Sequence, residues 1–493
     1  MKLLSAQQIH QWDAFTIAHE PVTSTDLMER AAQSCTDWLI ENNLHSKTIK
    51  IFCGKGNNGG DGLAIARQLI ERGVNPSVFI LEFGAKGTDD FQTNLNRLHP
   101  LTTEMFFLQS EDFFPAIQKD ELIIDALFGS GLNRPLTGLS ASLVEHINHS
   151  GADVVAIDVP SGMFIDKSSI GNPIVEATYA LTFQSLKLNF LLAENARWFG
   201  KVEVLDIGLH HAFLQEIDAD YNLLDKHFIS RHLIDRKPFS HKGTFGHALL
   251  VAGNKGKMGA AVLAARACLR SGVGLLTTFI PDEAVSIMQT AIPEAMVQVR
   301  EENPDLEKYG TLGIGPGLGT TDDAVSLVTS LLEKYAHPVV LDADALNIIS
   351  RNKDLLKQVP EGSVLTPHPK EFDRLFGESS NDFERLQKAI DASKEYPLTI
   401  ILKGHYSLVA QNGKGWFNTT GNAGMATGGT GDVLTGIITA LVAQKYPPFM
   451  AACIGVYVHG MAGDLALAYQ SEESLLPSDI VEALGTAFNQ LRY

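Results

Sequence analysis

The chain has 493 residues, of which 45% are hydrophobic and 19% are charged, and its formal net charge at pH 7 is −18. This length exceeds one ordinary hydrophobic core, so two or three domains are expected. The acidic balance argues against a general nucleic-acid or anionic-membrane surface, which would need clustered basic residues. An anionic ligand must therefore be held by backbone dipoles and a few local cations.

Cysteine usage and the first residues predict a soluble, cytoplasmic protein. The four cysteines at positions 35, 53, 268 and 453 form no CxxC pair, which favours small core residues over a redox or metal site. The opening stretch Met1-Lys2-Leu3-Leu4 turns polar too early for a signal peptide. No uninterrupted apolar run approaches the roughly 18–20 residues of a membrane span.

The first half of the chain reads as alternating strands and helices. Residues 1–30 predict helical stretches with a break around 20–24. The strand candidates that follow are residues 49–53, 77–83, 122–126, 154–159, 179–183 and 202–206. The segments between them are long enough for crossover helices, which predicts a Rossmann-like, three-layer α/β domain with a parallel sheet. In such sheets ligands bind beyond the carboxyl ends of the strands.

A domain boundary is expected near residue 220, in the stretch 209–237, which has little periodicity beyond a weak strand-like segment at 225–229. The second series of strand candidates is 247–252, 275–280, 311–314, 338–342, 363–366, 398–402 and 407–410. Helical patterns fall between them, for example at 260–271 and 322–335. We therefore predict two domains, residues 1–218 and 225–493, of which the second is a doubly wound α/β domain.

A glycine-rich motif, Gly54-Lys55-Gly56-Asn57-Asn58-Gly59-Gly60-Asp61-Gly62, follows the first strand and precedes a helical pattern at 63–71. Glycine N–H groups can approach an anion closely, and a helix N-terminus adds partial positive charge. As a dinucleotide fingerprint the motif is weak, because the nearest acidic partner is Glu82. It is no Walker A loop, since no Lys-Ser/Thr pair follows the glycines.

Polar residues also follow the later strands of this half. Parallel topology should bring five of them to one rim: Asn58, Asp125, Asp158, Ser161 and Lys187. Any one of them alone could be a loop cap or a solvated charge. Their shared place at strand carboxyl ends favours a common site.

Three motifs in this order resemble the YjeF N-terminal family, the NAD(P)HX epimerases, over essentially residues 1–215. They are the glycine-rich motif, Asp125-Ala126-Leu127-Phe128-Gly129-Ser130-Gly131-Leu132, and Asp158-Val159-Pro160-Ser161-Gly162. The resemblance implies contacts to a hydrated nicotinamide dinucleotide from Asn57, Asn58, Gly59, Gly60, Asp61, Gly129, Ser130, Gly131, Leu132, Asn133, Arg134, Pro135 and Asp158. The implied reaction interconverts the R and S forms at the hydrated ring carbon.

The resemblance also implies roles for individual side chains. Asp158 and Lys187 are the candidates for moving protons. Asn58, Asp125 and Ser161 resemble the family's potassium ligands. An amide oxygen, a carboxylate and a hydroxyl make a hard oxygen set, which suits K⁺ and does not suit zinc or copper.

A second motif, Ala426-Thr427-Gly428-Gly429-Thr430-Gly431-Asp432, opens a helical run at 433–444. Its N–H groups can bind an oxyanion, while the Asp432 carboxylate beside them can accept the proton of an attacking hydroxyl. The alternative is a capped helix after a glycine turn. Four glycines between residues 424 and 432 are more than a cap needs.

Further candidates lie at strand ends of the second half. The run Lys403-Gly404-His405-Tyr406-Ser407 suits a nucleotide phosphate or ribose, although an ordinary hairpin would read the same. His368 stands between two prolines and is either a ligand contact or a structural residue. The turn Gly315-Pro316-Gly317-Leu318-Gly319 allows close approach of its backbone to a substrate.

These features resemble the ribokinase-like NAD(P)HX dehydratases, from about residue 230 to the end, together with three further motifs: His241-Lys242-Gly243-x-x-Gly246, Met258-Gly259-Ala260-Ala261 and Leu269-Arg270-Ser271-Gly272. The resemblance implies substrate contacts from Ala260 or Ala261, Gly317, His368 and Asp432. It implies nucleotide contacts from Lys403, Gly404, His405, Tyr406, Ser407, Gly428, Gly429, Thr430 and Gly431. ADP is the implied phosphoryl donor, though the residues themselves do not separate ADP from ATP. Mg²⁺ is expected on the nucleotide phosphates.

The favoured hypothesis is a bifunctional repair enzyme that epimerises NADHX and NADPHX and dehydrates the S form. Related proteins commonly assemble, so a homo-oligomer is expected. One alternative is a vitamin-precursor kinase of the hydroxyethylthiazole or pyridoxal type with a non-catalytic N-terminal binding module. A redox dehydrogenase rests on the weak Gly54–Gly59 fingerprint alone. A purely non-enzymatic first half would leave Asp158 and Lys187 without a task.

Overall fold

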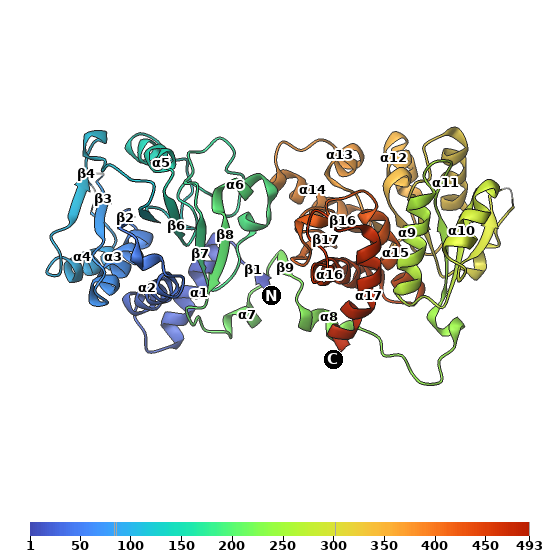
Figure 1. Cartoon of the computed structure of the whole chain (residues 1–493), viewed down its shortest axis with the longest axis horizontal. Coiled ribbons are helices and arrows are strands. Elements are labelled where there is room, and N and C mark those ends of the chain that lie inside the picture. Colours follow the sequence, from blue (N-terminus) through green and yellow to red (C-terminus); the bar gives the residue numbers. More distant parts are fainter. Residues whose placement is uncertain (83, 85, 301, 493) are drawn as a thin grey trace. The chain divides into compact units, whose positions relative to one another are not determined.

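The computed structural model describes residues 1–82, 84, 86–300 and 302–492, so that Phe83 of a predicted strand and Tyr493 of the predicted second domain lie outside the described residues. The chain divides into two compact units (Figure 1). The first unit comprises Lys2–Ala219 and Asn381–Phe383. The second unit comprises Met1, residues 220–380 and residues 384–492.

The first unit contains a parallel sheet in the order β4-β3-β2-β5-β6-β7-β8. Its strands are β2 Ile49–Cys53, β3 Ser77–Leu81, β4 Met105–Leu108, β5 Leu122–Ala126, β6 Asp153–Ile157, β7 Tyr179–Phe183 and β8 Lys201–Leu205; the short β1, Lys2–Leu3, is not part of this sheet. Its helices are α1 Ala6–His19, α2 Ser24–Glu41, α3 Asn57–Glu71, α4 Asp89–Leu98, α5 Leu139–His149, α6 Ala196–Phe199 and α7 Phe213–Glu216. The predicted parallel sheet is confirmed, and β4 is a strand that the sequence reading missed.

Helices cover both faces of this sheet, as alternation along the strands requires. In β2, Ile49 and Ile51 pack toward α2, α3 and α4. Phe52 points to the opposite face, where Leu143 and Ile147 of α5 complete a separate core. The result is the three-layer arrangement predicted for this half.

The second unit contains a larger sheet in the order β9-β18-β17-β16-β15-β14-β13-β10-β11-β12, parallel except at the two pairs that involve β17. Its strands are β9 Tyr221–Leu223, β10 His247–Val251, β11 Leu275–Ile280, β12 Met296–Val299, β13 Thr311–Ile314, β14 Val339–Leu341, β15 Val364–Leu365, β16 Thr399–Leu402, β17 Leu408–Gln411 and β18 Lys414–Phe417. Its helices are α8 Lys226–His232, α9 Met258–Arg270, α10 Val285–Ala291, α11 Asp322–Lys334, α12 Ala343–Arg351, α13 Pro369–Phe376, α14 Asp382–Glu395, α15 Thr430–Ala443, α16 Pro448–Ala466 and α17 Pro477–Arg492. The doubly wound fold is thereby confirmed.

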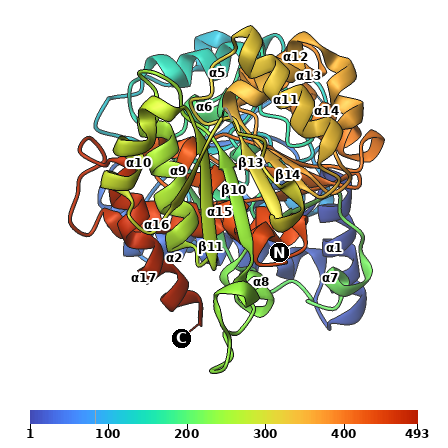
Figure 2. The same ribbon diagram turned by 90° about the vertical axis from the view of Figure 1, so that its right-hand side faces the viewer.

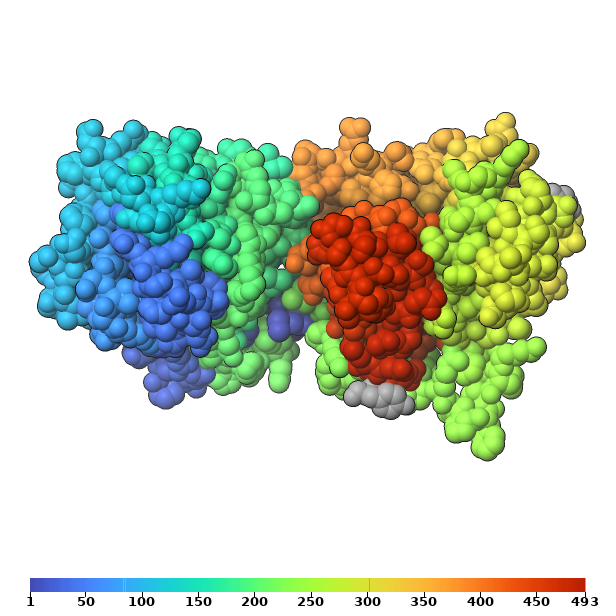
Figure 3. Space-filling view, viewed as in Figure 1, coloured from blue at the N-terminus to red at the C-terminus, as the bar shows by residue number. Residues whose placement is uncertain are grey.

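Figure 2 shows β10, β11, β13 and β14 side by side between two layers of helices. On one face α11 and α12 pack against the sheet, and on the other α9, α15 and α16 do so, with α17 packed against these helices. α16 is long and apolar enough to span a membrane, but most of it is buried in the core of this unit, as in many soluble proteins. In the space-filling view, the red residues, which include those of α16 and α17, form part of the near face of the second unit (Figure 3).

One local prediction was wrong. The strand-like segment 225–229 is the start of α8, because the Asp225 carboxylate accepts a hydrogen bond from Phe228 N at 2.8 Å and caps the helix. The apolar residues of a short amphipathic helix are easily misread as a strand.

Candidate active sites

In the first unit, the glycine-rich motif is largely helical, because α3 already begins at Asn57 instead of at residue 63. Close packing explains two of its glycines. A Cβ on Gly59 would lie 1.8 Å from the carbonyl oxygen of Gly54, and a Cβ on Gly62 would lie 2.6 Å from Cβ of Ala126. The first N–H groups of α3 have no carbonyl partner within the helix and are available to an anion.

Asp158 and Lys187 form a buried ion pair beside this helix. Lys187 Nζ lies 2.9 Å from Asp158 Oδ1, and Ser130 N donates to Asp158 Oδ2 at 2.8 Å. The Lys187 side chain is only 1% exposed. Burial alone would raise the pKa of Asp158, but the charge of Lys187 and these hydrogen bonds lower it below its usual value. The carboxylate is therefore held ionised.

Asp125 and Ser161 form a second buried pair. Ser161 Oγ donates to Asp125 Oδ1 at 2.6 Å, and Ser161 N donates to Oδ2 at 2.8 Å. Burial raises the pKa of Asp125 to about 6 although these bonds oppose the shift. Phe128 N donates to Ser161 Oγ at 2.8 Å, which ties the pair to the loop after β5.

The five residues predicted at one rim all lie at this end of the sheet. A Cβ on Gly129 would lie 2.9 Å from Asp158 Oδ2 and 3.2 Å from Asn58 Oδ1, so these side chains converge on one glycine. Asn58 is buried, and its Nδ2 has no hydrogen-bond partner among the described residues. In contrast, Asn133, Arg134 and Pro135 are exposed on the loop that continues toward α5.

Two more carboxyl groups belong to this neighbourhood. Burial, reinforced by the charge of Asp158, raises the pKa of Asp61 well above its ordinary value. Burial also raises the pKa of Asp13 on α1 to about 6, with His10 opposing the shift. Asp13 was missed by the sequence reading, whose only available signal was a polar pair one turn apart on α1. His10 Nε2 lies 3.6 Å from where a Cβ of Gly131 would stand, so α1 borders the loop.

In the second unit, α15 begins at Thr430, three residues earlier than predicted, so Asp432 lies in its first turn. The N-cap residue Gly429 has a φ of 106°, a left-handed conformation that favours glycine. Gly428 has no neighbouring atom within 4 Å of where a Cβ would stand. The space on the Cβ side of this residue is therefore open.

Asp342 is the main residue that the sequence reading missed here. Its Oδ1 lies 2.7 Å from Lys403 Nζ, and its Oδ2 accepts a 2.7 Å hydrogen bond from Thr435 Oγ1. A Cβ on Gly431 would lie 3.4 Å from Lys403 Nζ. The lysine is thus fixed against the first turn of α15.

The carboxyl group of Asp432 has a pKa close to neutral pH. Burial and then the charge of Asp342 raise its pKa to about 7, while Lys403 partly opposes the shift. A carboxylate with such a pKa is suited to accept a proton at physiological pH.

His368 and residues 403–407 have structural roles and also lie near the candidate site. His368 caps α13, since its Nδ1 accepts from Lys370 N at 3.1 Å, and burial followed by the charge of Lys403 lowers its pKa. The residues 403–407 do form a hairpin between β16 and β17, and Gly404 and His405 in it are exposed. The hairpin and the site are compatible, because Lys403 points back to Asp342.

Gly317 packs against the start of α9. With a φ of 61°, a Cβ there would lie 3.0 Å from Cβ of Ala260 and 2.7 Å from the carbonyl oxygen of Lys257. Ala261 is fully buried in the core behind them. Of the two alanines, Ala260 therefore lies on the side of the glycine turn.

Comparison with known proteins gives the same division of the chain. The family described as YjeF-related protein N-terminus matches residues 24–189, and the family described as NAD(P)H-hydrate dehydratase matches residues 248–485. The bifunctional NAD(P)H-hydrate repair enzyme of Moorella thermoacetica is 34% identical over 98% of this chain and 96% of its own length. The chain belongs to this family of bifunctional repair enzymes. The enzyme of the same name from Coxiella burnetii is 34% identical over 99% of each chain.

A solved structure supports the ribokinase-like fold of the second unit in this repair enzyme. The ADP/ATP-dependent NAD(P)H-hydrate dehydratase of Bacillus subtilis, co-crystallised with ATP and Mg²⁺, is 31% identical over 55% of this chain and 98% of its own, with a TM-score of 0.50. Family membership favours the repair hypothesis over the vitamin-kinase alternative.

Within residues 1–82, 84, 86–300 and 302–492, no group of three His, Cys, Asp or Glu side chains could hold a metal ion. The four cysteines are buried and free.

Proposed function

We propose that the first site interconverts R- and S-NAD(P)HX, and that the second site dehydrates S-NAD(P)HX to NAD(P)H with ADP, releasing AMP and phosphate. The observation that carries the proposal is Asp432, a carboxyl group with a pKa of about 7 in the first turn of a glycine-started helix, next to the Lys403–Asp342 pair. Such a group can take a hydroxyl proton while neighbouring N–H groups bind a phosphoryl group.

The chemistry of the second site follows from the leaving group. A ring hydroxyl leaves poorly, whereas a phosphate ester leaves well. In our proposal Asp432 accepts the hydroxyl proton as phosphorylation begins, and the N–H groups of Gly428–Gly431 bind the transferred phosphoryl group. Lys403 binds the nucleotide phosphates. Elimination of phosphate from this ring carbon, together with a proton from the neighbouring ring carbon, then restores the conjugated dihydronicotinamide. Mg²⁺ would neutralise the nucleotide phosphates, which usually supply most of its ligands besides water.

At the first site, moving the hydroxyl from one face of the ring carbon to the other needs a proton for the departing oxygen and a base for the incoming water. Asp158, held ionised by Lys187, is our candidate for the base, and the Lys187 ammonium is our candidate for the proton donor. The N-terminus of α3 and the loop 129–135 are assigned to the dinucleotide.

A potassium ion fits the donors around Asp125. The Asn58 amide oxygen, the Asp125 carboxylate and the Ser161 hydroxyl are hard oxygen ligands. Burial raises the pKa of Asp125 to about 6, so a cation beside it would compensate a costly buried charge. K⁺ would supply a fixed positive charge next to the substrate site.

Four buried free thiols fit a reducing compartment, so we place the enzyme in the cytoplasm. Assembly into a homo-oligomer stays a prediction.

The test is a recovery assay on an R/S mixture of NADHX, followed by the near-ultraviolet absorbance of reduced nicotinamide with ADP, with ATP and with neither. Complete, ADP-dependent recovery is expected, because epimerisation refills the S form as it is consumed. A stall at the S fraction would disprove the epimerase half. No recovery with either nucleotide would disprove the dehydratase half and favour a small-molecule kinase.

A further inference from the structure

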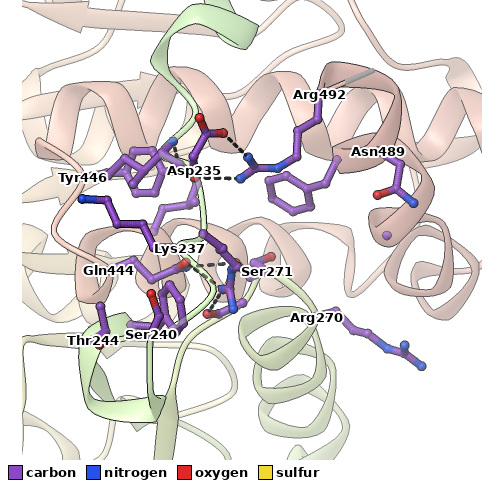
Figure 4. Close-up of a pocket in the computed structure, with 17 residues that line it drawn as sticks. Asp235, Lys237, Ser240, Thr244, Arg270, Ser271, Gln444, Tyr446, Asn489 and Arg492 are labelled. Carbon is purple, nitrogen blue, oxygen red and sulfur yellow. Dashed lines mark hydrogen bonds and ion pairs between the residues drawn. The ribbon is translucent and has the colours of Figure 1, made fainter.

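A second pocket of this unit lies at the edge of the sheet opposite the candidate active site (Figure 4). It is lined by the connector before β10 and by the last residues of α9, α15 and α17. α15 begins in the active site at Thr430 and ends at Ala443, which at 1.5 Å per residue spans about 20 Å. The pocket is therefore separate from the catalytic centre.

The pocket has firm walls and the size of a small-molecule site. Its volume is about 460 Å³, within the usual range of ligand pockets. A Cβ on Gly246, whose φ is 77°, would lie 1.9 Å from the carbonyl oxygen of Ala443, and a Cβ on Gly274 would lie 1.7 Å from that of Lys242. The motif His241-Lys242-Gly243-x-x-Gly246, for which the proposed reaction has no use, thus fixes the backbone on both sides of Thr244 and Phe245, which line the pocket.

Basic side chains surround the pocket, and two of them are neutralised. Arg492 Nη1 lies 3.0 Å from Asp235 Oδ1, as Figure 4 shows, and Arg270 Nη2 lies 3.0 Å from Glu482 Oε2. These pairs cancel in charge.

The other two basic residues leave positive charge uncompensated. Arg236 donates to the carbonyl oxygen of Gly272 and, at 3.1 Å, to Gln444 Oε1, both neutral acceptors. The Lys237 side chain also lines the pocket, and its ammonium group has no ion-pair or hydrogen-bond partner within the described part of the chain. Burial and then the charge of Arg492 lower the pKa of Arg236, so the two guanidinium groups repel each other. Two positive charges match a dianion.

The pocket also contains a buried hydroxyl group, that of Ser271, whose hydrogen-bonding capacity is unused among the described residues. Ser271 is only 5% exposed, lines the pocket, and has a hydroxyl with no hydrogen-bond partner among the described residues. An unsatisfied buried hydroxyl lowers the stability of the fold, and a hydrogen bond to a ligand oxygen would recover that loss. Capping of helix C-termini explains why Arg236 binds the Gly272 carbonyl. It explains neither the Ser271 hydroxyl nor the cavity.

Aromatic side chains provide a place for a flat ring. Phe245, Tyr446 and Phe488 line the pocket, and the Arg236 guanidinium stacks on the Phe245 ring at 3.9 Å. Ile234 N donates to the Tyr446 hydroxyl oxygen at 2.8 Å, which leaves the tyrosine O–H free to donate. The volume is too large for inorganic phosphate alone and suits a phosphate joined to a ring.

We propose that this pocket binds a small organic phosphomonoester, with its phosphate between Arg236, Lys237 and the Ser271 hydroxyl and its ring against Phe245 and Phe488. The proposal does not depend on the catalytic function of either unit.

The test is a calorimetric titration of the full chain with phenyl phosphate while the catalytic nucleotide site is filled with α,β-methylene-ADP. One saturable site is expected. Lys237→Met and Arg236→Met should each weaken binding about tenfold, the loss of one charge-assisted contact. Ser271→Ala should weaken it several-fold. Lys334→Met removes an exposed lysine of α11 and should bind phenyl phosphate like the wild type.

Arg236 holds the Gly272 carbonyl, so its variant could misfold; Lys237→Met and Ser271→Ala touch no backbone contact and keep the test decisive. Benzyl alcohol, uncharged and of similar size, should not bind. The proposal is overturned if the wild type shows no saturable binding, or if Lys237→Met and Ser271→Ala both bind as tightly as Lys334→Met. Equal affinity for benzyl alcohol would also overturn it.

Discussion

Lys403 Nζ lies 2.7 Å from Asp342 Oδ1, so the lysine nearest the glycine-rich helix start is neutralised by a carboxylate other than Asp432. Burial and the Asp342 charge then raise the pKa of Asp432 to about 7. In the proposed mechanism, Lys403 binds the nucleotide phosphates while it is held in place by Asp342, and Asp432 exchanges a proton near neutral pH.

The rate of dehydration should rise with pH through about 7, because Asp432 can accept a proton only in its ionised form. The profile of kcat/KM against pH for S-NADHX with ADP measures this directly. Asp432→Asn should lower kcat by about 10²-fold or more, in line with loss of a general base. A flat profile between pH 5.5 and 8 would speak against Asp432 as the base.

Asp342→Asn should move the acid limb of that profile downward by roughly one unit, because it removes a negative charge that raises the pKa of Asp432 and leaves Lys403 unpaired beside it. Thr435→Val is the matched control, since it removes a hydrogen bond to Asp342 without changing charge and should leave the limb in place. An unmoved limb in Asp342→Asn would show that the two carboxylates do not interact.

Substitutions of the neighbouring residues Gly428 and Gly429 should have different effects, one on ADP binding and the other on stability. Gly429→Ala forces alanine into a left-handed conformation against Leu263 and should lower the free energy of unfolding by about 1–2 kcal/mol. Gly428→Ala meets no protein atom within 4 Å, so it should leave stability unchanged and raise KM for ADP. Urea denaturation and steady-state kinetics check both. Equal effects of the two variants on stability would contradict this account.

The strand ends could be predicted because parallel topology sends every carboxyl end to the same edge of a sheet. Asn58, Asp158 and Lys187 were placed together on that argument alone. The partner of Lys403 could not be predicted, since Asp342 lies 61 residues away and only the order β14-β15-β16 brings them near. Asp13 was not predicted for the same reason, because no pattern in the sequence of α1 shows which loop this helix contacts in the folded unit.

From the sequence, the glycines of residues 54–62 were explained by anion binding alone. The structure adds close packing as a second reason for glycine at some of these positions. Gly59 and Gly62 are required by close contact with Gly54 and Ala126, whether or not an anion binds. Packing of this kind depends on interhelical and helix–strand distances, which residue types alone do not encode.

Substitutions at the Asp158–Lys187 pair should separate epimerisation from folding. Asp158→Asn should lower epimerisation by about 10²-fold or more and leave the dehydration of pure S-NADHX unchanged. Lys187→Met leaves a buried carboxylate without its counter-charge and should destabilise the first unit by about 3–5 kcal/mol. The double variant should regain stability but not epimerisation. Unchanged epimerisation in Asp158→Asn would reduce the pair to a structural role.

Potassium should stabilise the first unit more at pH 7 than at pH 5. Asp125 has a pKa of about 6 when folded against 3.8 as its ordinary value, so the native state binds the extra proton and loses stability as pH rises from about 4 to 6. The loss above pH 6 is about 3 kcal/mol in the absence of a cation. An ion bound to the ionised carboxylate would offset it. Thermal unfolding in KCl and in tetramethylammonium chloride at both pH values measures the difference.

Asp125→Asn supplies the control for the potassium experiment, because a neutral amide has no proton to lose and attracts a cation less. Its unfolding temperature should respond to neither pH in this window nor potassium, beyond the changes that other groups cause in both proteins. If wild type and Asp125→Asn gain the same stability from KCl, the ion acts elsewhere and the assignment of Asn58, Asp125 and Ser161 as its ligands is wrong. A potassium effect that is confined to the wild type and grows with pH requires the ionised Asp125 carboxylate.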